Sequence, residues 1–135
     1  MTTTAAQQHV NGACLCGAVH FKALLPSKWC AHCHCSLCRK AHGAGYVTWA
    51  GFEQEQVAVT GDELEWYDSS PGAQRGFCRR CGSTMFFRSE RWAGELHIAL
   101  GCMDDPIDKT PAANAFFDAH VDWMPIDHSL RQVDG

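Results

Sequence analysis

The chain has 135 residues, of which 46% are apolar and 19% are charged, and its formal net charge is −4. This length suits a single domain with a modest core, and the composition excludes a disordered protein. The acidic balance and the lack of a Lys/Arg run weigh against nucleic acid as a partner, and no apolar run is long enough to cross a bilayer.

The expected elements begin after residues 1–9, which are predicted to be frayed and to precede one domain over residues 10–135. The amino end lacks the basic start and apolar stretch of a signal peptide, which predicts a cytoplasmic protein. Turn-forming residues then separate short β-rich segments, which are 17–21, 45–49, 56–60, 64–67, 83–87 and 96–100. Only residues 36–42 predict a helix, with Gly43 as its end. Many short strands and almost no helix predict a mainly β fold of stacked sheets.

The nine cysteines are the most informative residues of the chain. Disulfides rarely persist in a reducing compartment, so cysteines at this density are typical of metal ligands or catalytic thiols. Two groups have the spacing of zinc ligands. Cys102 lies outside both groups. It follows an apolar segment and is expected to pack in the core.

The first group combines Cys14 and Cys16 with the Cys-x-x-Cys pair of Cys78 and Cys81. Two residues apart on an extended chain, Cys14 and Cys16 would project to the same face. Gly82 gives the second pair the backbone freedom of a knuckle turn. Four thiolates form a closed tetrahedral site, which indicates a structural zinc ion that ties the start of the domain to a later hairpin.

The second group is Cys33, Cys35 and Cys38, of which the last two are joined by a Cys-x-x-Cys step into the predicted helix. Three protein ligands leave the fourth tetrahedral position for water or substrate, which is the pattern of a catalytic zinc site. The alternative is a second closed site, in which a neighbouring side chain is the fourth ligand: Cys30, His32 or His34.

Other side chains are weaker candidates. Three cations could receive a substrate carboxylate, although a solvated surface charge is the more common role: Arg39, Lys40 and Arg88. Three aromatic residues could wall a pocket, although a core position is at least as common: Trp49, Phe52 and Trp123.

The motifs resemble those of the glutathione-dependent formaldehyde-activating (GFA) enzymes and their centromere protein V-like relatives. The resemblance runs through four segments: Gly-Ala-Cys-Leu-Cys-Gly at 12–17, Cys-His-Cys-Ser-Leu-Cys-Arg-Lys at 33–40, Phe-Cys-Arg-Arg-Cys-Gly-Ser at 77–83 and His-Val-Asp-Trp at 120–123. It implies an Mss4-like fold of stacked antiparallel sheets clipped by zinc. It also implies a structural ion at Cys14, Cys16, Cys78 and Cys81, and a catalytic ion at Cys33, Cys35 and Cys38.

The leading functional hypothesis is therefore a zinc-dependent carbon–sulfur lyase with two zinc ions per chain. By resemblance, its substrate is a small thiol adduct similar to S-hydroxymethylglutathione, formed from formaldehyde and glutathione. Three thiolate ligands make zinc a weak Lewis acid, which favours binding and positioning of a thiolate over strong activation of water. The alternative hypothesis is a non-catalytic zinc scaffold that binds a protein partner.

Overall fold

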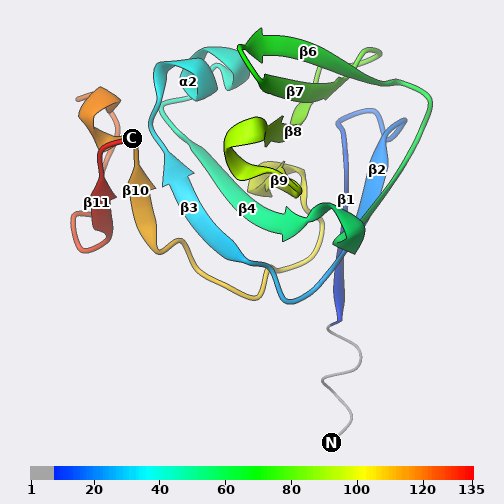
Figure 1. Cartoon of the computed structure of the whole chain (residues 1–135), viewed down its shortest axis with the longest axis horizontal. Helices are drawn as coiled ribbons and strands as arrows, with labels where there is room; N and C mark the ends of the chain where they lie inside the picture. The colour runs from blue at the N-terminus through cyan, green and yellow to red at the C-terminus, as the bar shows by residue number, and fades with distance from the viewer. Residues whose placement is uncertain (1–7) are drawn as a thin grey trace, which may run out of the picture.

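The protein, a computed structural model that describes residues 8–135, is built from two β-sheets and, among the residues described, one α-helix (Figure 1). The predicted mainly β class is confirmed, and most of the expected frayed segment, residues 1–7, lies outside the described residues. The strands are β1 (His9–Ala13), β2 (His20–Leu24), β3 (Trp29–Cys33), β4 (Val47–Glu53), β5 (Val57–Thr60), β6 (Leu64–Ser70), β7 (Ala73–Cys78), β8 (Thr84–Ser89), β9 (Glu95–Ala99), β10 (Ala113–Ala115) and β11 (Arg131–Val133), and the helix is α2 (Ser36–His42).

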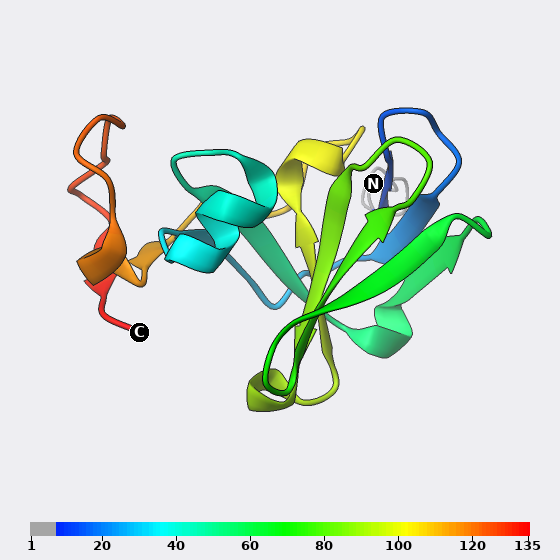
Figure 2. The ribbon, with the colours of Figure 1, turned by 90° about the horizontal axis from the view of Figure 1, so that it is seen from above.

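The smaller sheet has the strand order β1-β2-β5, and the larger sheet has the order β11-β10-β3-β4-β9-β8-β7-β6. Strands β1 to β9 pair antiparallel, as expected, whereas β10 pairs parallel with both β3 and β11. In Figure 2 this carboxy-terminal part, in orange and red, lies at the opposite end of the molecule from β1 and β2, in blue.

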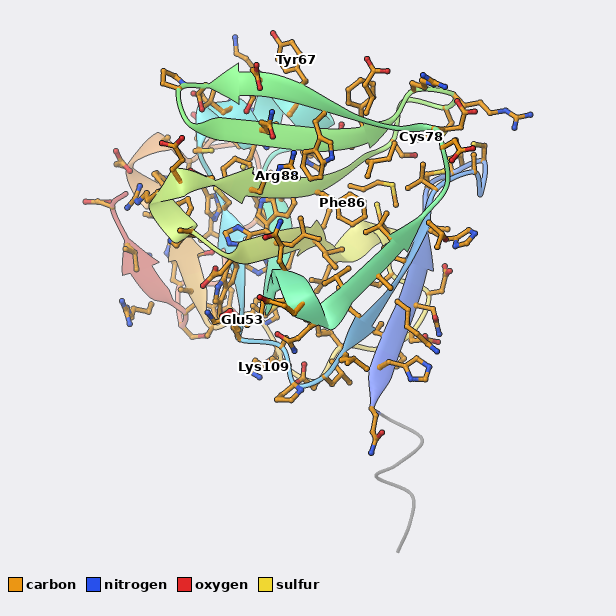
Figure 3. The ribbon with its side chains drawn as sticks, turned by 45° about the vertical axis from the view of Figure 1, so that its right-hand side comes forward. Glu53, Tyr67, Cys78, Phe86, Arg88 and Lys109 are labelled. Carbon is orange, nitrogen blue, oxygen red and sulfur yellow. The ribbon has the colours of Figure 1, made fainter. Side chains whose placement is uncertain are left out.

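The main core fills the space between the two sheets. Phe21 of the smaller sheet meets Phe86 of the larger one edge to face, with ring centroids 5.7 Å apart. Figure 3 shows Phe86 on the side of the large sheet that faces the smaller one. Phe52 and Ile98, from the neighbouring strands β4 and β9, are fully buried in the same cluster. Burial of these large apolar side chains supplies most of the driving force for folding.

The opposite face of the large sheet carries a second, smaller cluster. Because side chains alternate along a strand, Val47 and Trp49 of β4 point away from Phe52 and pack with Cys38 of α2. Strand β4 is therefore covered on both faces, and its sequence is almost continuously apolar rather than alternating. This second face positions the candidate site.

Helix α2 begins and ends as the sequence predicts. Cys35 is its N-cap, with a side chain that accepts a hydrogen bond from the Cys38 backbone N–H, and Gly43 ends the helix in the left-handed conformation at φ 60°. A cap of this kind satisfies one of the free N–H groups of the first turn, and a glycine adopts positive φ without steric cost.

Each of the six predicted β-rich segments overlaps a strand of the structure, but five strands were not predicted: β1, β3, β7, β10 and β11. Strand β3 ends at Cys33, the first residue of the second cysteine group. Its cysteine and histidine residues suggest metal ligands, so the sequence there does not show the alternation of a strand. Strand β7 contains Arg75 and Gly76, both buried, which runs against the preference of strands for β-branched and aromatic residues. Among the residues described, no helix is long and apolar enough to span a membrane.

Candidate metal centres and the adjoining cavity

The first cysteine group comes together where two turns meet. The Sγ atoms of Cys14, Cys16, Cys78 and Cys81 all lie within 4.8 Å of one another. The Cys14–Cys16 separation is 3.7 Å and the Cys16–Cys78 separation is 3.8 Å. Zn–S bonds of about 2.3 Å in tetrahedral geometry place sulfur atoms about 3.8 Å apart. The four sulfurs therefore have the spacing that a tetrahedral zinc ion requires.

Backbone turns hold these sulfurs in place. Gly17 and Gly82, each directly after the second cysteine of its pair, have φ values of 83° and 84°. The Gly82 N–H donates to the Cys78 carbonyl at 2.7 Å, which closes the predicted knuckle. Cys16 also lies in a turn, so the expectation that Cys14 and Cys16 share the face of an extended strand is wrong. The turn achieves the same result because Gly17 lets the chain reverse.

A side chain links the two turns directly. The Leu15 backbone N–H donates to Ser83 Oγ at 3.0 Å, across 68 residues of sequence. A hydrogen bond from Ser83 also lowers the pKa of Cys81 to about 5. In Figure 3, Cys78 lies where the β7–β8 turn approaches the loop that joins β1 and β2. This group thus connects the small sheet to the large one.

The second cysteine group lies at the end of β3 and the start of α2. The Sγ atoms of Cys33, Cys35 and Cys38 lie within 4.8 Å of one another, and those of Cys33 and Cys38 are 3.4 Å apart. Hydrogen bonds from the Cys33 and Cys38 thiols lower the pKa of Cys35 to about 2, and the nearby charge of Arg75 adds to the effect. Cys35 is therefore the thiol of the trio that ionises most readily.

Arg75 is the counter-charge of this group. Only 5% of the residue is exposed, and both terminal nitrogens lie 3.7 Å from Cys38 Sγ. Its guanidinium carbon lies 4.9 Å from the centroid of the Phe87 ring, and its Nε has no hydrogen-bond partner among the described residues. A buried cation is costly unless it is paired. No local sequence pattern indicates a role for Arg75, because it belongs to no motif and is 37 residues from Cys38.

The three side chains considered as a fourth ligand face elsewhere. Cys30 and His32 lie on β3 at positions that alternate with Cys33 and point to the opposite face of the sheet. His32 Nδ1 is 2.8 Å from Thr48 Oγ1, and His34 Nε2 is 3.0 Å from Asn114 Oδ1. Within residues 8–135, none of the three joins the sulfur cluster.

The cysteine trio lies on the wall of a cavity of about 490 Å³. Pockets that bind small organic molecules span roughly 300–1,000 Å³. The floor is the second face of the large sheet, and the walls come from α2 and from residues after β10. Five aromatic side chains line it, namely Trp29, Trp49, Phe87, Trp92 and Phe116, together with the cations Arg75 and Arg91.

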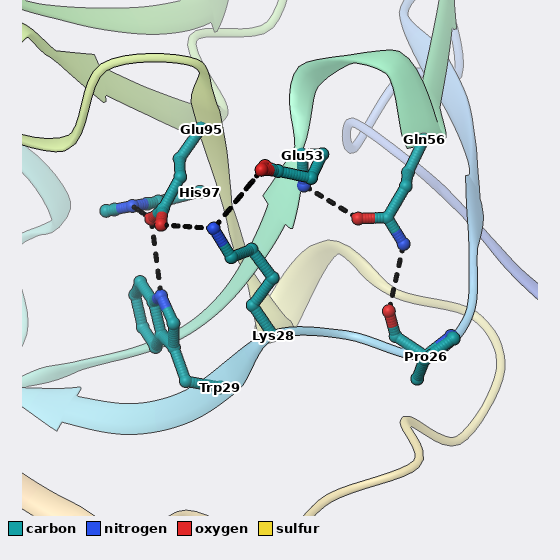
Figure 4. Close-up of polar contacts among 7 residues, drawn as sticks. All are labelled: Pro26, Lys28, Trp29, Glu53, Gln56, Glu95 and His97. Carbon is teal, nitrogen blue, oxygen red and sulfur yellow. Dashed lines mark hydrogen bonds and ion pairs between the residues drawn. The ribbon is translucent and has the colours of Figure 1, made fainter.

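A polar network fixes the end of the cavity away from the cysteines (Figure 4). Glu95 accepts hydrogen bonds from Trp29 Nε1 at 3.3 Å and from Lys28 Nζ at 2.8 Å, and His97 Nε2 lies 2.9 Å from the same carboxylate. Burial lowers the pKa of His97, which favours the neutral ring, and because the Glu95 carboxylate can only accept, Nε2 is the nitrogen that donates to it. The network therefore holds two cavity-lining rings, Trp29 and His97, in fixed orientations.

The backbone is strained on the opposite wall. Phe116, at φ 53°, is the one residue other than glycine with positive φ among the described residues. A left-handed conformation costs a residue with a Cβ about 1–2 kcal/mol. Such strain is frequent at functional sites, and here it places an aromatic side chain against the cavity.

Of the other side chains that the sequence analysis considered, only Trp49 lines the cavity. Trp49 does line the cavity, whereas Phe52 is fully buried in the main core and 66% of Trp123 is exposed. Arg88 stacks over Trp66, with its guanidinium carbon 3.7 Å from the ring centroid, on the other side of β8. Cys102 packs against both apolar clusters, as expected of a core thiol. Neither Arg39 nor Lys40 is among the residues that line the cavity.

The comparison with known families decides the relationship of this chain. The model of the family described as "Glutathione-dependent formaldehyde-activating enzyme" matches residues 9–119, which include both cysteine groups. The chain belongs to this family. The resemblance inferred from the motifs is thereby confirmed.

Relatives within the family have similar names. A protein of Halomonas elongata, provisionally named a glutathione-dependent formaldehyde-activating enzyme, is 30% identical over 128 residues, which span 87% of this chain and 81% of the relative. A Schizosaccharomyces pombe protein named as an uncharacterized lyase is 33% identical over 77 residues, or 57% of this chain and 56% of its own length. The crystal structure of a Rhodobacter sphaeroides protein has the same fold, with a TM-score of 0.61 and 24% identity, covering 75% of this chain and 97% of that one.

Proposed function

We propose that this protein is a zinc-dependent enzyme of the carbon–sulfur lyase type that acts on a small thiol–aldehyde adduct similar to S-hydroxymethylglutathione. The observation that carries the proposal is the set of three sulfur atoms on the wall of a small-molecule cavity, with no fourth protein ligand among the described residues. Catalytic zinc sites have three protein ligands and a position for water or substrate. The family description and the names of the relatives support the same reaction class.

In this proposal the two cysteine groups have different roles. Cys14, Cys16, Cys78 and Cys81 hold a structural zinc ion, because four ligands close a tetrahedral site. Cys33, Cys35 and Cys38 hold the catalytic ion. Soft thiolates suit zinc, and the sulfur spacing of the first group matches its tetrahedral geometry.

The reaction needs no oxidant or reductant. Cleavage breaks the carbon–sulfur bond of the adduct, transfers the proton of its hydroxyl group to the sulfur, and releases a thiol and an aldehyde. Formation of the adduct is the reverse. A zinc ion at the cysteine trio would supply affinity for the thiolate sulfur and weak polarisation of the aldehyde oxygen.

The residues of the chain contribute position and charge. Arg75 offsets the negative charge of the trio through its two contacts with Cys38 Sγ. The aromatic walls exclude water, so that the thiolate and the aldehyde carbon meet in a defined orientation. Trp29 and His97, held by Glu95, keep the far end of the cavity rigid.

The proposal is tested by metal content and turnover together. We expect elemental analysis to find two zinc ions per chain, and NMR exchange measurements to show faster interconversion of glutathione plus formaldehyde with the adduct. Cys35→Ser should retain one zinc ion and lose at least about 100-fold in turnover, because it removes a ligand of the catalytic ion.

Cys102→Ser is the matched control, because it also removes one thiol but from outside both groups. It should keep two zinc ions and full turnover. Two zinc ions and unchanged turnover in Cys35→Ser would contradict the proposal.

A further inference from the structure

The charged side chains on the cavity wall, apart from the cysteines, are positive. Arg75 and Arg91 line the cavity, and none of the 15 acidic residues of the chain does. The chain as a whole has a formal net charge of −4, so the charge on this wall is opposite in sign to that of the protein. A concave site with cations and no carboxylates favours an anionic ligand.

The two arginines differ in what they already bind. Both terminal nitrogens of Arg75 lie 3.7 Å from Cys38 Sγ. The side chain of Arg91 forms one hydrogen bond within residues 8–135, from Nη2 to the main-chain oxygen of Gly135 at 3.1 Å. No ion pair among these residues includes Arg91. A guanidinium has five N–H donors in a planar fork, so most donors of Arg91 remain for a ligand.

Two aromatic rings of the cavity hold the Arg91 guanidinium. Its central carbon lies 4.6 Å from the centroid of the Trp92 ring and 5.6 Å from that of Phe116. The Arg91 backbone N–H donates to Ser89 Oγ at 3.2 Å, at the start of the short turn η2 (Glu90–Trp92). Aromatic faces attract a guanidinium and leave the N–H groups on its edge for hydrogen bonds. The side chain is therefore oriented before a ligand binds, which lowers the entropic cost of binding.

Phe116 brings this cation to the cysteine end of the cavity. Ala115 of β10 pairs with Cys33 of β3, and Phe116 is the next residue. Neighbouring strands lie about 4.8 Å apart and one residue adds about 3.3 Å, so the backbones of Phe116 and Cys33 are roughly 6 Å apart. The left-handed backbone of Phe116 thus places a ring, and the Arg91 guanidinium with it, beside the sulfur cluster.

Glutathione has an anionic group that matches this position. Its sulfur and its glycine carboxylate belong to adjacent residues, which span about 7 Å of extended chain. The γ-glutamyl carboxylate is less suitable, because the ammonium group beside it is repelled by a guanidinium. A carboxylate and a guanidinium form two parallel charge-assisted hydrogen bonds. We propose that Arg91 is a specificity-determining residue that binds the glycine carboxylate of the thiol substrate, an inference that rests on the proposed function.

The test compares glutathione with its glycine ethyl ester, which retains the thiol and the γ-glutamyl group. Isothermal titration calorimetry of the zinc-loaded protein gives both dissociation constants. We expect glutathione to bind about tenfold more tightly than the ester, because the ester loses the charge-assisted hydrogen bonds. Arg91→Met should bind both ligands with the weaker affinity. Methionine keeps an apolar side chain between the two rings, so the variant should fold, which its thermal unfolding checks.

Arg88→Met is the matched control for the loss of a cation. Arg88 is three residues away in the sequence, stacks over Trp66 and does not line the cavity. This variant should keep the tenfold preference for glutathione over the ester. Equal preferences in Arg91→Met and Arg88→Met would overturn the inference, and so would a wild-type protein that binds the two ligands alike or does not bind glutathione.

Cys35→Ser separates this inference from the proposed function. It removes a sulfur from the trio and leaves Arg91 in place, so it should weaken both ligands by the same factor. If both ligands weaken in Cys35→Ser but the wild-type protein does not distinguish them, the role of Arg91 fails and the proposed function stands. If Cys35→Ser binds both ligands as tightly as the wild-type protein does, the proposed function fails, and the role of Arg91 in substrate choice fails with it.

Discussion

The two cysteine groups of this protein use the same ligand chemistry in opposite surroundings. The group of four lies between two turns at the junction of the sheets, and the turns are linked to each other by the Leu15–Ser83 hydrogen bond. The group of three adjoins a cavity, and its partner from the rest of the chain is the buried guanidinium of Arg75. In the proposed function, the number of sulfurs and the space beside them, rather than the type of residue, distinguish a centre that completes the fold from one that is open to a ligand.

The largest expected effect separates the two groups by stability. Cys14→Ser should cost about 3 kcal/mol or more in the free energy of unfolding, because folding and metal binding are coupled where the ion joins distant segments. Cys35→Ser, which leaves the junction of the sheets intact, should cost clearly less. Urea denaturation of the two variants checks this difference, and equal losses would mean that both centres are structural.

The next effect concerns the positive charge beside the cysteine trio. Arg75→Met removes the cation beside Cys38 and should weaken zinc affinity at the trio about 10- to 100-fold, the usual range for residues that support metal ligands. Titration against a competing zinc chelator measures this, with Arg88→Met as a control on the same sheet but stacked on Trp66. Equal zinc affinities of the two variants would contradict this role of Arg75.

A smaller effect tests the rigidity of the cavity. Glu95→Ala leaves the Trp29 and His97 N–H groups without an acceptor and should cost roughly 1–3 kcal/mol of stability. Glu63 is the control, because it pairs at the surface with Arg79, whose side chain is 56% exposed. Glu63→Ala should change stability by about 0.5 kcal/mol or less. Thermal unfolding of both variants distinguishes the network from a surface ion pair.

The last effect is a dependence on pH and is absent at neutral pH. Burial lowers the pKa of His42, at the end of α2, to about 4, so the unfolded chain binds a proton below its ordinary pKa of about 6.5 while the folded chain does not. The resulting stability is fully present above pH 6.5 and declines as the pH falls toward 4, by at most about 1.4 kcal/mol per pH unit. His42→Gln should flatten the stability profile in this window. Parallel profiles for the two proteins would show that His42 does not contribute.

The sequence by itself determined the two cysteine groups, the helix and the mainly β class. These features depend on short-range spacing: two cysteine pairs with a glycine directly behind each, and a capped turn from Cys35 to Gly43. Spacing along the chain is a local property, and the geometry of a turn or a helix start follows from it directly.

Only the tertiary structure decided what surrounds those groups. Arg75 is 37 residues from Cys38, and Glu95 is 66 residues from Trp29. No local sequence pattern predicts either contact. Strand pairing brings them together, because register and alternation select which side chains share one face of the sheet. The cavity, its aromatic walls and the orientation of Cys30 and His32 away from the trio all follow from that register.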